Sequence, residues 1–247
     1  MRKRWKRSLP KKLLCFSTAV MMMAVILMSS IPVKAASVRE YIEFFNTGKI
    51  YRSVNTTLYQ YNSITKTLTL KGGTINCYEM CFLESNVKGL RINVEKDTTI
   101  YDGYICLNGD TTITGPGKLT IAPTTDHTKL SVAISIVGYN LTLDHANLDI
   151  TASAFLGELF GSKAISAGGF GERLVIRESQ ISAKAGKAAI SGFNGGILTS
   201  FCNVISPFVT KQKNGSIYQS DGKTLAKEVM IAAFYYKQQL NTRTFQR

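Results

Sequence analysis

The chain has 247 residues, of which 45% are hydrophobic and 19% are charged, with a mean hydropathy of +0.02. This composition is typical of a packed globular protein and excludes a disordered or collagen-like chain. The formal net charge is +14, but eight of the 30 basic residues lie within the first 34 positions, so the charge does not indicate nucleic-acid binding along the whole chain.

The first 35 residues are predicted to be a secretory signal peptide. A basic segment at 2–12 precedes an apolar run at 13–28, and Val33 and Ala35 occupy the two positions that the peptidase reads. Cleavage after Ala35 removes 35 residues and leaves 212, with a net charge of +6. The alternative is an uncleaved anchor, because the run is almost long enough to span a membrane. We expect a secreted, extracellular protein with no nucleic-acid partner and no stable membrane insertion.

Short strand-like segments recur through the mature chain with a base period of about 22 residues, as in a solenoid. They begin at Leu68, Leu90, Thr111, Leu141, Leu174 and Ile197, at intervals of 22, 21, 30, 33 and 23 residues. The two long intervals predict insertions at 122–130 and 154–162. Alternation of apolar and polar residues between turns rich in Gly and Asn excludes a helical or leucine-rich repeat.

Each unit contains two further strand-like pieces. The second lies at 118–122, 147–151, 180–183 and 203–205, and the third is an Ala-Ile-Ser triplet that begins at Ala133, Ala164 and Ala189. Three short strands per unit predict a triangular coil. Stacked coils give an all-β fold, a single-stranded parallel β-helix of about six coils that needs capping strands at its ends.

This fold predicts two interior columns of apolar side chains. We expect one column to contain Leu70, Ile92, Ile113, Leu143 and Ile176. We expect the second to contain Ile75, Leu119, Leu148 and Ile181.

The expected organisation is a signal peptide at 1–35, an N-terminal cap at 36–65, β-helix repeats at 66–208 and a C-terminal cap strand and tail at 209–247. In the N-terminal cap, Ser37 and Glu40 are compatible with a helix capping box, whereas residues 46–48 are compatible with a hairpin turn, which we favour. In the C-terminal cap, residues 225–231 are predicted to form a final strand, although the apolar spacing there also suits a helix.

The segments 61–70, 89–95, 109–121 and 226–231 resemble a family of exported bacterial β-helical proteins, largely uncharacterised, that are often labelled carbohydrate-binding domain proteins. The resemblance covers about residues 58–231. It implies a right-handed parallel β-helix on the cell exterior and polysaccharide binding, and it carries no established catalytic residues. The two insertions and the tail after 231 depart from the family pattern.

Enzymatic chemistry has little support in the sequence. Polysaccharide lyases and hydrolases need clustered carboxylates. The position after each first strand instead reads Lys71, Asn93, Thr114, Asp144, Arg177 and Ser200, and Asp149 aligns with Thr120 and Ser182. We therefore expect no catalytic residues, and rank a pectate-lyase-like enzyme last. His127 lies beside Asp126 in the first insertion, and His145 lies beside Asp144 in a turn. Either could act as a base, although a single histidine on a loop is usually solvated.

Metal and disulfide chemistry remain open. Asp97, Asp102 and Asp110 could hold calcium or could face solvent, and no other cofactor is expected. The four cysteines that remain after cleavage allow disulfides, although small buried thiols are the favoured interpretation. They are Cys77, Cys81, Cys106 and Cys202.

The best candidate for binding is the corner that follows each Ala-Ile-Ser triplet. It carries Tyr139, Phe170 and Phe193 among glycines, with Asn140 and Asn194 beside them. Rings stacked at the coil spacing suit a glycan, and the alternative is that they pack on one another to close the corner. We expect a non-enzymatic protein that binds glycan or cell-wall polysaccharide, the alternative being a structural or adhesive spacer for a protein partner.

Overall fold

A computed structural model describes residues 40–44, 48–50, 54–125, 131–152, 161–207 and 211–234. The expected signal peptide, the peptidase site, His127 and most of both insertions lie outside the described residues. The fold described below belongs to the unit that begins at Glu40.

The described residues form 22 strands and no α-helix. The strands are, in chain order, β1 (Ile42–Phe44), β2 (Gly48–Ile50), β3 (Val54–Asn55), β4 (Tyr59–Asn62), β5 (Thr67–Leu70), β6 (Gly73–Ser85), β7 (Leu90–Val94), β8 (Thr98–Leu107), β9 (Thr111–Thr114), β10 (Lys118–Ala122), β11 (Val132–Ile136), β12 (Leu141–Asp144), β13 (Asn147–Thr151), β14 (Lys163–Ala167), β15 (Arg173–Arg177), β16 (Gln180–Lys184), β17 (Ala188–Ser191), β18 (Gly196–Ser200), β19 (Cys202–Ser206), β20 (Lys211–Lys213), β21 (Ser216–Tyr218) and β22 (Glu228–Ala233).

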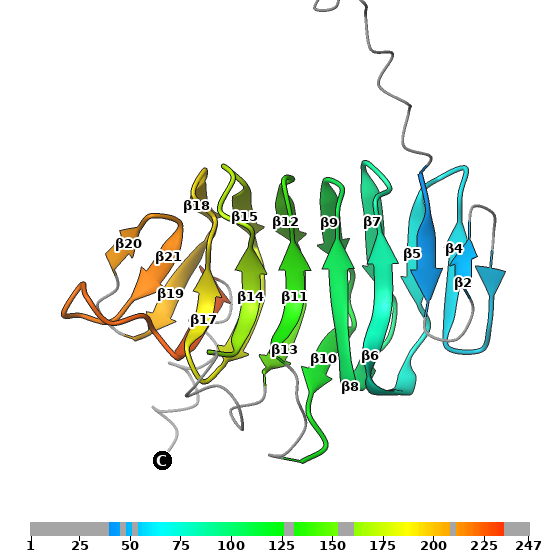
Figure 1. Cartoon of the computed structure of the whole chain (residues 1–247), viewed down its shortest axis with the longest axis horizontal. Coiled ribbons are helices and arrows are strands. Elements are labelled where there is room, and N and C mark those ends of the chain that lie inside the picture. Colours follow the sequence, from blue (N-terminus) through cyan, green and yellow to red (C-terminus); the bar gives the residue numbers. More distant parts are fainter. Residues whose placement is uncertain are drawn as a thin grey trace, which may run out of the picture. The chain divides into compact units, whose positions relative to one another are not determined.

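Parallel strands from successive units pair in three ladders (Figure 1). The first ladder contains β5, β7, β9, β12, β15 and β18. The second contains the first halves of β6 and β8, then β10, β13 and β16. The third contains the second halves of β6 and β8, then β11, β14 and β17. We call one passage through the three ladders a coil.

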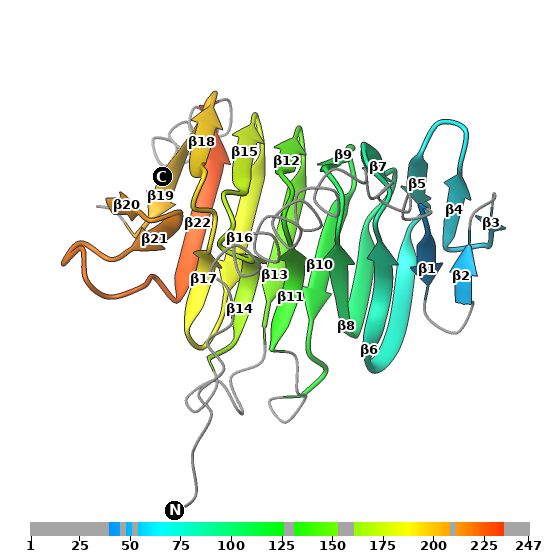
Figure 2. The same ribbon diagram turned by 45° about the horizontal axis from the view of Figure 1, so that its top comes forward.

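Strand β8 shows how the sheet curls. Its residues Thr98–Tyr101 pair with β10, whereas Ile105–Leu107 pair with β11, so one bent strand serves two ladders. Because of β6 and β8, the second and third ladders form one 12-stranded sheet, and the first ladder belongs to an 8-stranded sheet (Figure 2). The chain is thus all-β with a curled, mostly parallel sheet, consistent with a β-solenoid-like fold.

The first interior column is largely confirmed. Ile92, Ile113, Leu143 and Ile176 are in register from β7 to β15. The prediction is wrong for Leu70, which pairs with Val94. The register partner of Ile92 is Leu68 instead.

A bulge in β6 explains this shift of register. Asn76 pairs with Tyr101 and Leu83 with Ile105, so β6 contains three residues more than β8 between the same two partners. The extra residues lengthen the first coil without disturbing the alternation of apolar and polar residues on either side.

The second column needs the same kind of correction. Leu119, Leu148 and Ile181 are in register, as predicted. Ile75 is one row away, because it pairs with Ile100, which pairs in turn with Ile121. All nine predicted core residues are nevertheless buried.

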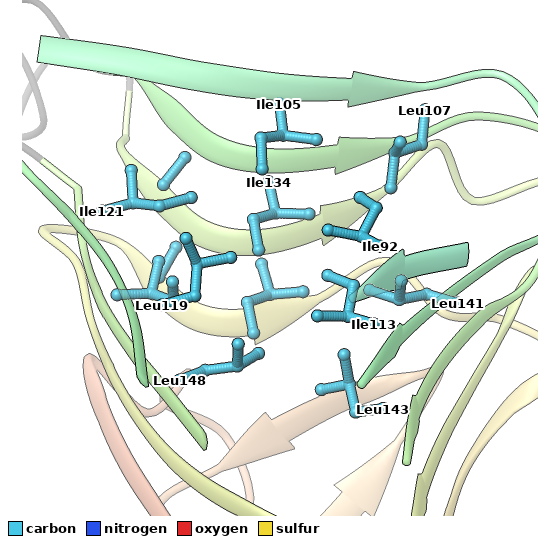
Figure 3. Close-up of a cluster of buried hydrophobic side chains, with 14 of the residues drawn as sticks. Ile92, Ile105, Leu107, Ile113, Leu119, Ile121, Ile134, Leu141, Leu143 and Leu148 are labelled. Carbon is cyan, nitrogen blue, oxygen red and sulfur yellow. The ribbon is translucent and has the colours of Figure 1, made fainter. Parts of the chain in front are cut away.

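The core lies between the ladders. Figure 3 shows Ile113 and Leu143 of the first ladder, Leu119 of the second and Ile134 of the third converging on one interior. Burying each such side chain contributes about 1.5–3 kcal/mol, so the alternation read from the sequence supplies the main stabilising force.

Antiparallel strands cover some of the ladder ends, whereas β17 and β18 end their ladders as parallel strands. β1 and β2 form the expected N-terminal hairpin, and β1 also pairs antiparallel with β6. The predicted C-terminal strand is confirmed as β22, which pairs antiparallel with β16 and β19. A short hairpin of β20 and β21 lies between β19 and β22 in the chain.

Candidate functional site

The candidate site is the turn that joins the third ladder to the first, here called the aromatic corner and comprising residues 137–140, 168–172 and 192–195. Ile136 pairs with Ala167 and Leu141 with Leu174, so the first two of these turns lie on adjacent coils. The turns differ in length, and the rings that they carry therefore need not form one evenly spaced ladder.

Phe170 is the most exposed ring of the corner, with a relative exposure of 80%. It lies between Gly169 and Gly171, whose φ angles of 86° and 105° are in the left-handed region that favours glycine. These glycines let the turn hold a large apolar side chain in solvent.

The buried side chain of Glu172 accepts hydrogen bonds from two turns of the aromatic corner. Its side chain accepts the N–H of Gly138 at Oε1 (2.8 Å) and the N–H of Phe170 at Oε2 (2.6 Å), and the residue is only 2% exposed. Burial alone would raise the pKa of Glu172, but hydrogen bonds from backbone N–H groups outweigh burial and lower the pKa. One carboxylate therefore ties two adjacent coils together and fixes the backbone under the Phe170 ring.

We expect Glu172→Gln to reduce the free energy of unfolding by about 1.5–3 kcal/mol near neutral pH, because the charged acceptor is lost. The lowered pKa of folded Glu172 means that its stabilisation is present above the ordinary glutamate pKa of about 4.3 and is lost as pH falls through the folded-state value. Urea unfolding across this acidic range should show parent and variant converging. Glu95→Gln, at an exposed glutamate, controls for the change in net charge. A constant difference between parent and Glu172→Gln at every pH would contradict the assignment.

The Tyr139 side chain is only partly exposed to solvent. Its ring packs against the hydrophobic core, and the Nζ of Lys88 lies 6.0 Å from the ring centroid. That distance is at the limit of a cation–π contact. Tyr139 and Lys88 together present an aromatic edge and a positive charge to solvent.

The two asparagines hold the turns together. The Oδ1 of Asn140 accepts the N–H of Arg173 (2.9 Å), and the Nδ2 of Asn194 donates to the carbonyl of Gly169 (2.8 Å). Within the described residues, the Nδ2 of Asn140 and the Oδ1 of Asn194 have no such partner. Each amide thus keeps one polar group for a ligand.

The expectation that Phe193 is exposed beside the other rings is wrong. Phe193 is 0% exposed and belongs to the core. Its N–H donates to the carbonyl of Gly215 (2.9 Å) in the turn of the β20–β21 hairpin. A Cβ on Gly215 would come within 1.8 Å of the Phe193 backbone, so only glycine allows this close approach. The corner therefore presents Tyr139 and Phe170, and its third coil is closed.

The three aspartates considered for calcium connect successive coils. Asp97 accepts the N–H of Lys118 (2.8 Å), and Asp110 accepts the N–H of Asn140 (2.8 Å). Asp102 accepts both the N–H and the hydroxyl of Thr124 (2.7 and 2.6 Å). Among the residues that the structure describes, no group of three His, Cys, Asp or Glu side chains is placed to hold a metal ion. In this structural role, a side-chain oxygen accepts a backbone N–H of the next coil. The sequence signal for it is an Asp or Asn that lies one coil before the turn whose N–H it accepts.

His145 contacts its neighbour Asp144 and also Glu178, a partner that the sequence did not predict. Its Nδ1 lies 3.0 Å from an oxygen of Asp144, and its Nε2 lies 3.3 Å from an oxygen of Glu178 on the next coil. The predicted column is confirmed in register from Asn93 to Ser200 and is not acidic, but the prediction is wrong for Lys71, because Asn93 pairs with Thr69. Glu178 lies one residue beyond this column, so the repeat pattern does not align it with the other residues at this position.

The four cysteines in the described part of the chain are free thiols: Cys77 and Cys202 are buried, and Cys81 and Cys106 are half-buried. Burial raises the pKa of Cys77 and of Cys81 to about 12. These two thiols are therefore protonated and unreactive at neutral pH.

The fold defines an all-β protein with a curled, mostly parallel sheet, and comparison with protein-family models, curated proteins and solved structures found no match. Among the described residues, no helix has the length and apolar character needed to cross a membrane.

Proposed function

We propose that this chain is an exported, non-enzymatic right-handed parallel β-helix protein that binds an acidic glycan or cell-wall polysaccharide at the aromatic corner. The three in-register parallel ladders support the β-helix, and the basic and apolar N-terminal segments support export. A secreted protein of this kind would meet its ligand outside the cell.

The observation that carries the proposal is the Phe170 ring, 80% exposed on a turn that Glu172 holds rigid. An exposed ring on a braced backbone gives a flat apolar surface at low entropic cost, and the C–H groups of a sugar ring pack well on such a surface. The free polar groups of Asn140 and Asn194 supply one donor and one acceptor for sugar hydroxyls.

Two exposed basic residues border the corner, where the Asp110 carboxylate also accepts the N–H of Asn140, and these basic residues are the groups that would pair with an acidic sugar. Lys88 lies beside the Tyr139 ring, and Arg173 follows the braced turn as an exposed residue. Both are cations that can pair with a uronic acid carboxylate. Because exposed ion pairs are screened by salt, binding at this corner should weaken as ionic strength rises.

The test is a glycan array of uronic-acid and neutral glycans, read with the parent chain, Phe170→Ala and Phe201→Ala at low and high salt. Phe201 is a second exposed phenylalanine, in the turn after β18, and serves as the matched control. We expect the parent and Phe201→Ala to bind acidic glycans alike and Phe170→Ala to lose at least about tenfold in affinity, as removal of a central ring does. Parallel arms with calcium and with a chelator test whether a metal contributes.

Two results would overturn this assignment. One is a folded Phe170→Ala variant that binds as well as the parent. The other is a parent that binds no acidic glycan under any of these conditions.

The second candidate is a spacer that contacts a protein partner. It is favoured by apolar side chains near the end of the ladders, where Phe201 is 61% exposed and its carbonyl accepts the N–H of Phe234, also exposed. Exposed aromatic residues gathered in one place are typical of interaction surfaces. Loss of partner binding in Phe201→Ala, with no glycan bound by the parent, would favour this candidate.

A further inference from the structure

We infer that the free edge of β18 is a self-association surface, at which two copies of this chain pair antiparallel about a two-fold axis. β18 is the terminal strand of the first ladder, and β15 is the only strand that pairs with it among the described residues (Figures 1 and 2). This edge does not include the exposed rings of the aromatic corner, so self-association there does not depend on the function proposed for the corner.

The interior of the first ladder reaches solvent at β18. Thr199 is in register with Ile176, so it occupies the last position of the first interior column. Ile176 and its neighbour Leu143 in this column are 0% exposed, whereas Thr199 is exposed. The terminal unit of a repeat protein normally needs a cap that covers its outer side. In the described part of the chain, the column is therefore uncovered at Thr199.

The β18 edge has none of the features that protect the edges of natural sheets. Such edges commonly carry charged residues or proline, or are covered by another segment. β18 contains neither residue type, and its Leu198 and the following Phe201 are 53% and 61% exposed. The edge of β17 is different, because the N–H of Ala189 donates to the carbonyl of Ala226 (2.8 Å). The bare edge of the last coil is therefore at β18.

The backbone of Thr199 offers a free donor and a free acceptor at this edge. The carbonyl of Ser200 accepts the N–H of Glu178 (3.0 Å), so the backbone groups of Ser200 point back toward the preceding coil. Backbone groups of successive residues point to opposite sides of a strand, so those of Thr199 point away from β15. Within the described residues, no strand lies on that side of β18 to pair with them.

A second β18 strand satisfies both of these groups. In an antiparallel pair centred on Thr199, the N–H of each Thr199 donates to the Thr199 carbonyl of the other copy. Leu198 of one copy then lies opposite Ser200 of the other, and the two Leu198 residues are diagonal neighbours about 7–8 Å apart. Long charged side chains at Leu198 would be within reach of each other, which makes this residue the position for a test.

The chemistry of the edge suits a second copy as the partner. A two-fold axis brings each group near the same group of the other copy, so a charged edge would place like charges together. Residues 196–201 carry no charge, although the chain has a formal net charge of +14. The N–H of Phe234, which is 47% exposed, donates to the Phe201 carbonyl, so aromatic surface continues beside the edge. The cores of homodimer interfaces are likewise apolar, poor in charge and enriched in aromatic residues.

The experiment is sedimentation velocity of the parent chain at concentrations up to about 100 μM, a range that covers weak self-association. The test variants are Leu198→Lys and Leu198→Glu, each alone and as an equimolar mixture. The matched controls are Thr142→Lys and Thr142→Glu, because Thr142 lies in the same outward row as Leu198, two coils earlier. Circular dichroism and thermal unfolding show that each variant is folded.

We expect the parent and both Thr142 variants to form dimers. Leu198→Lys and Leu198→Glu should each self-associate at least about tenfold more weakly, because like charges meet across the axis. The mixture of these two variants should recover the dimer, because opposite charges then meet. Recovery in the mixture is specific to a surface that pairs with itself.

Four results would overturn the inference: a parent that stays monomeric, folded Leu198 variants that dimerise like the parent, Thr142 variants that lose the dimer equally, or a mixture that recovers no dimer. A monomeric parent that dimerises only after removal of residues 235–247 would assign the edge to the chain's own C-terminal segment. A monomeric parent that binds a different protein through Leu198 would assign the edge to that partner. Either of these assignments would also overturn the inference.

Discussion

Replacing Phe193 with alanine is expected to destabilise the folded chain by about 3–5 kcal/mol, the range for removal of a fully buried phenylalanine. The ring has no exposed surface, and the backbone of the β20–β21 hairpin lies directly against the Phe193 backbone. Truncation would leave a cavity in the hydrophobic core, which chemical denaturation should detect as a lower midpoint at unchanged slope.

Phe170→Ala is the control for this prediction, because it removes the same side chain from the same corner one coil earlier. At 80% exposure, Phe170 contributes little to packing, and its loss should change the free energy of unfolding by less than about 0.5 kcal/mol. Equal destabilisation by the two substitutions would contradict the assignment of Phe193 as a buried ring and Phe170 as an exposed ring.

Leu143→Ala is expected to reduce the free energy of unfolding by about 2–5 kcal/mol, as truncation of a buried leucine does. Leu143 is 0% exposed and is flanked in its column by Ile113 and Ile176 on the adjacent coils. Neither neighbour can move into the space without leaving its own strand register. The cost should therefore lie toward the upper part of the range.

Thr142→Ala provides the comparison for Leu143→Ala. Thr142 is adjacent in sequence on β12 but faces outward, so its truncation should alter the unfolding free energy by less than about 0.5 kcal/mol. A reversed order of effects would mean that β12 presents the other face to the core and would refute the register of the first ladder.

Much of the fold could be predicted because the repeat carries two independent signals, its period and the alternation of apolar and polar residues. The period places strands on neighbouring coils, and the alternation within each strand decides which side chains are buried; together they predicted the rows through Ile113 and Leu119. The bulge between Asn76 and Leu83 could not be found in this way, since it adds residues where no periodic pattern exists.

The candidate site was harder to predict because exposure depends on segments that are distant in sequence. Phe170 and Phe193 both lie in glycine-containing turns that follow an Ala-Ile-Ser triplet, yet only Phe193 is covered, by a hairpin whose turn begins at Asn214. The aspartates pose a related problem. An isolated Asp in a turn gives no indication that its partner is the backbone N–H of Lys118 or Asn140, one coil further along.

The reversal of strand direction at the ends of the ladders limits how far the structure can extend. β4 runs antiparallel to β5, β1 to β6 and β22 to β16, so these ends do not present the parallel edge that joins one coil to the next. At these three ends a second molecule finds no parallel edge that continues the same in-register stack, which is how natural sheets avoid growth into fibres. The first and third ladders end instead in β18 and β17, which run parallel to their neighbours, so within the described part of the chain no reversed strand closes these two edges.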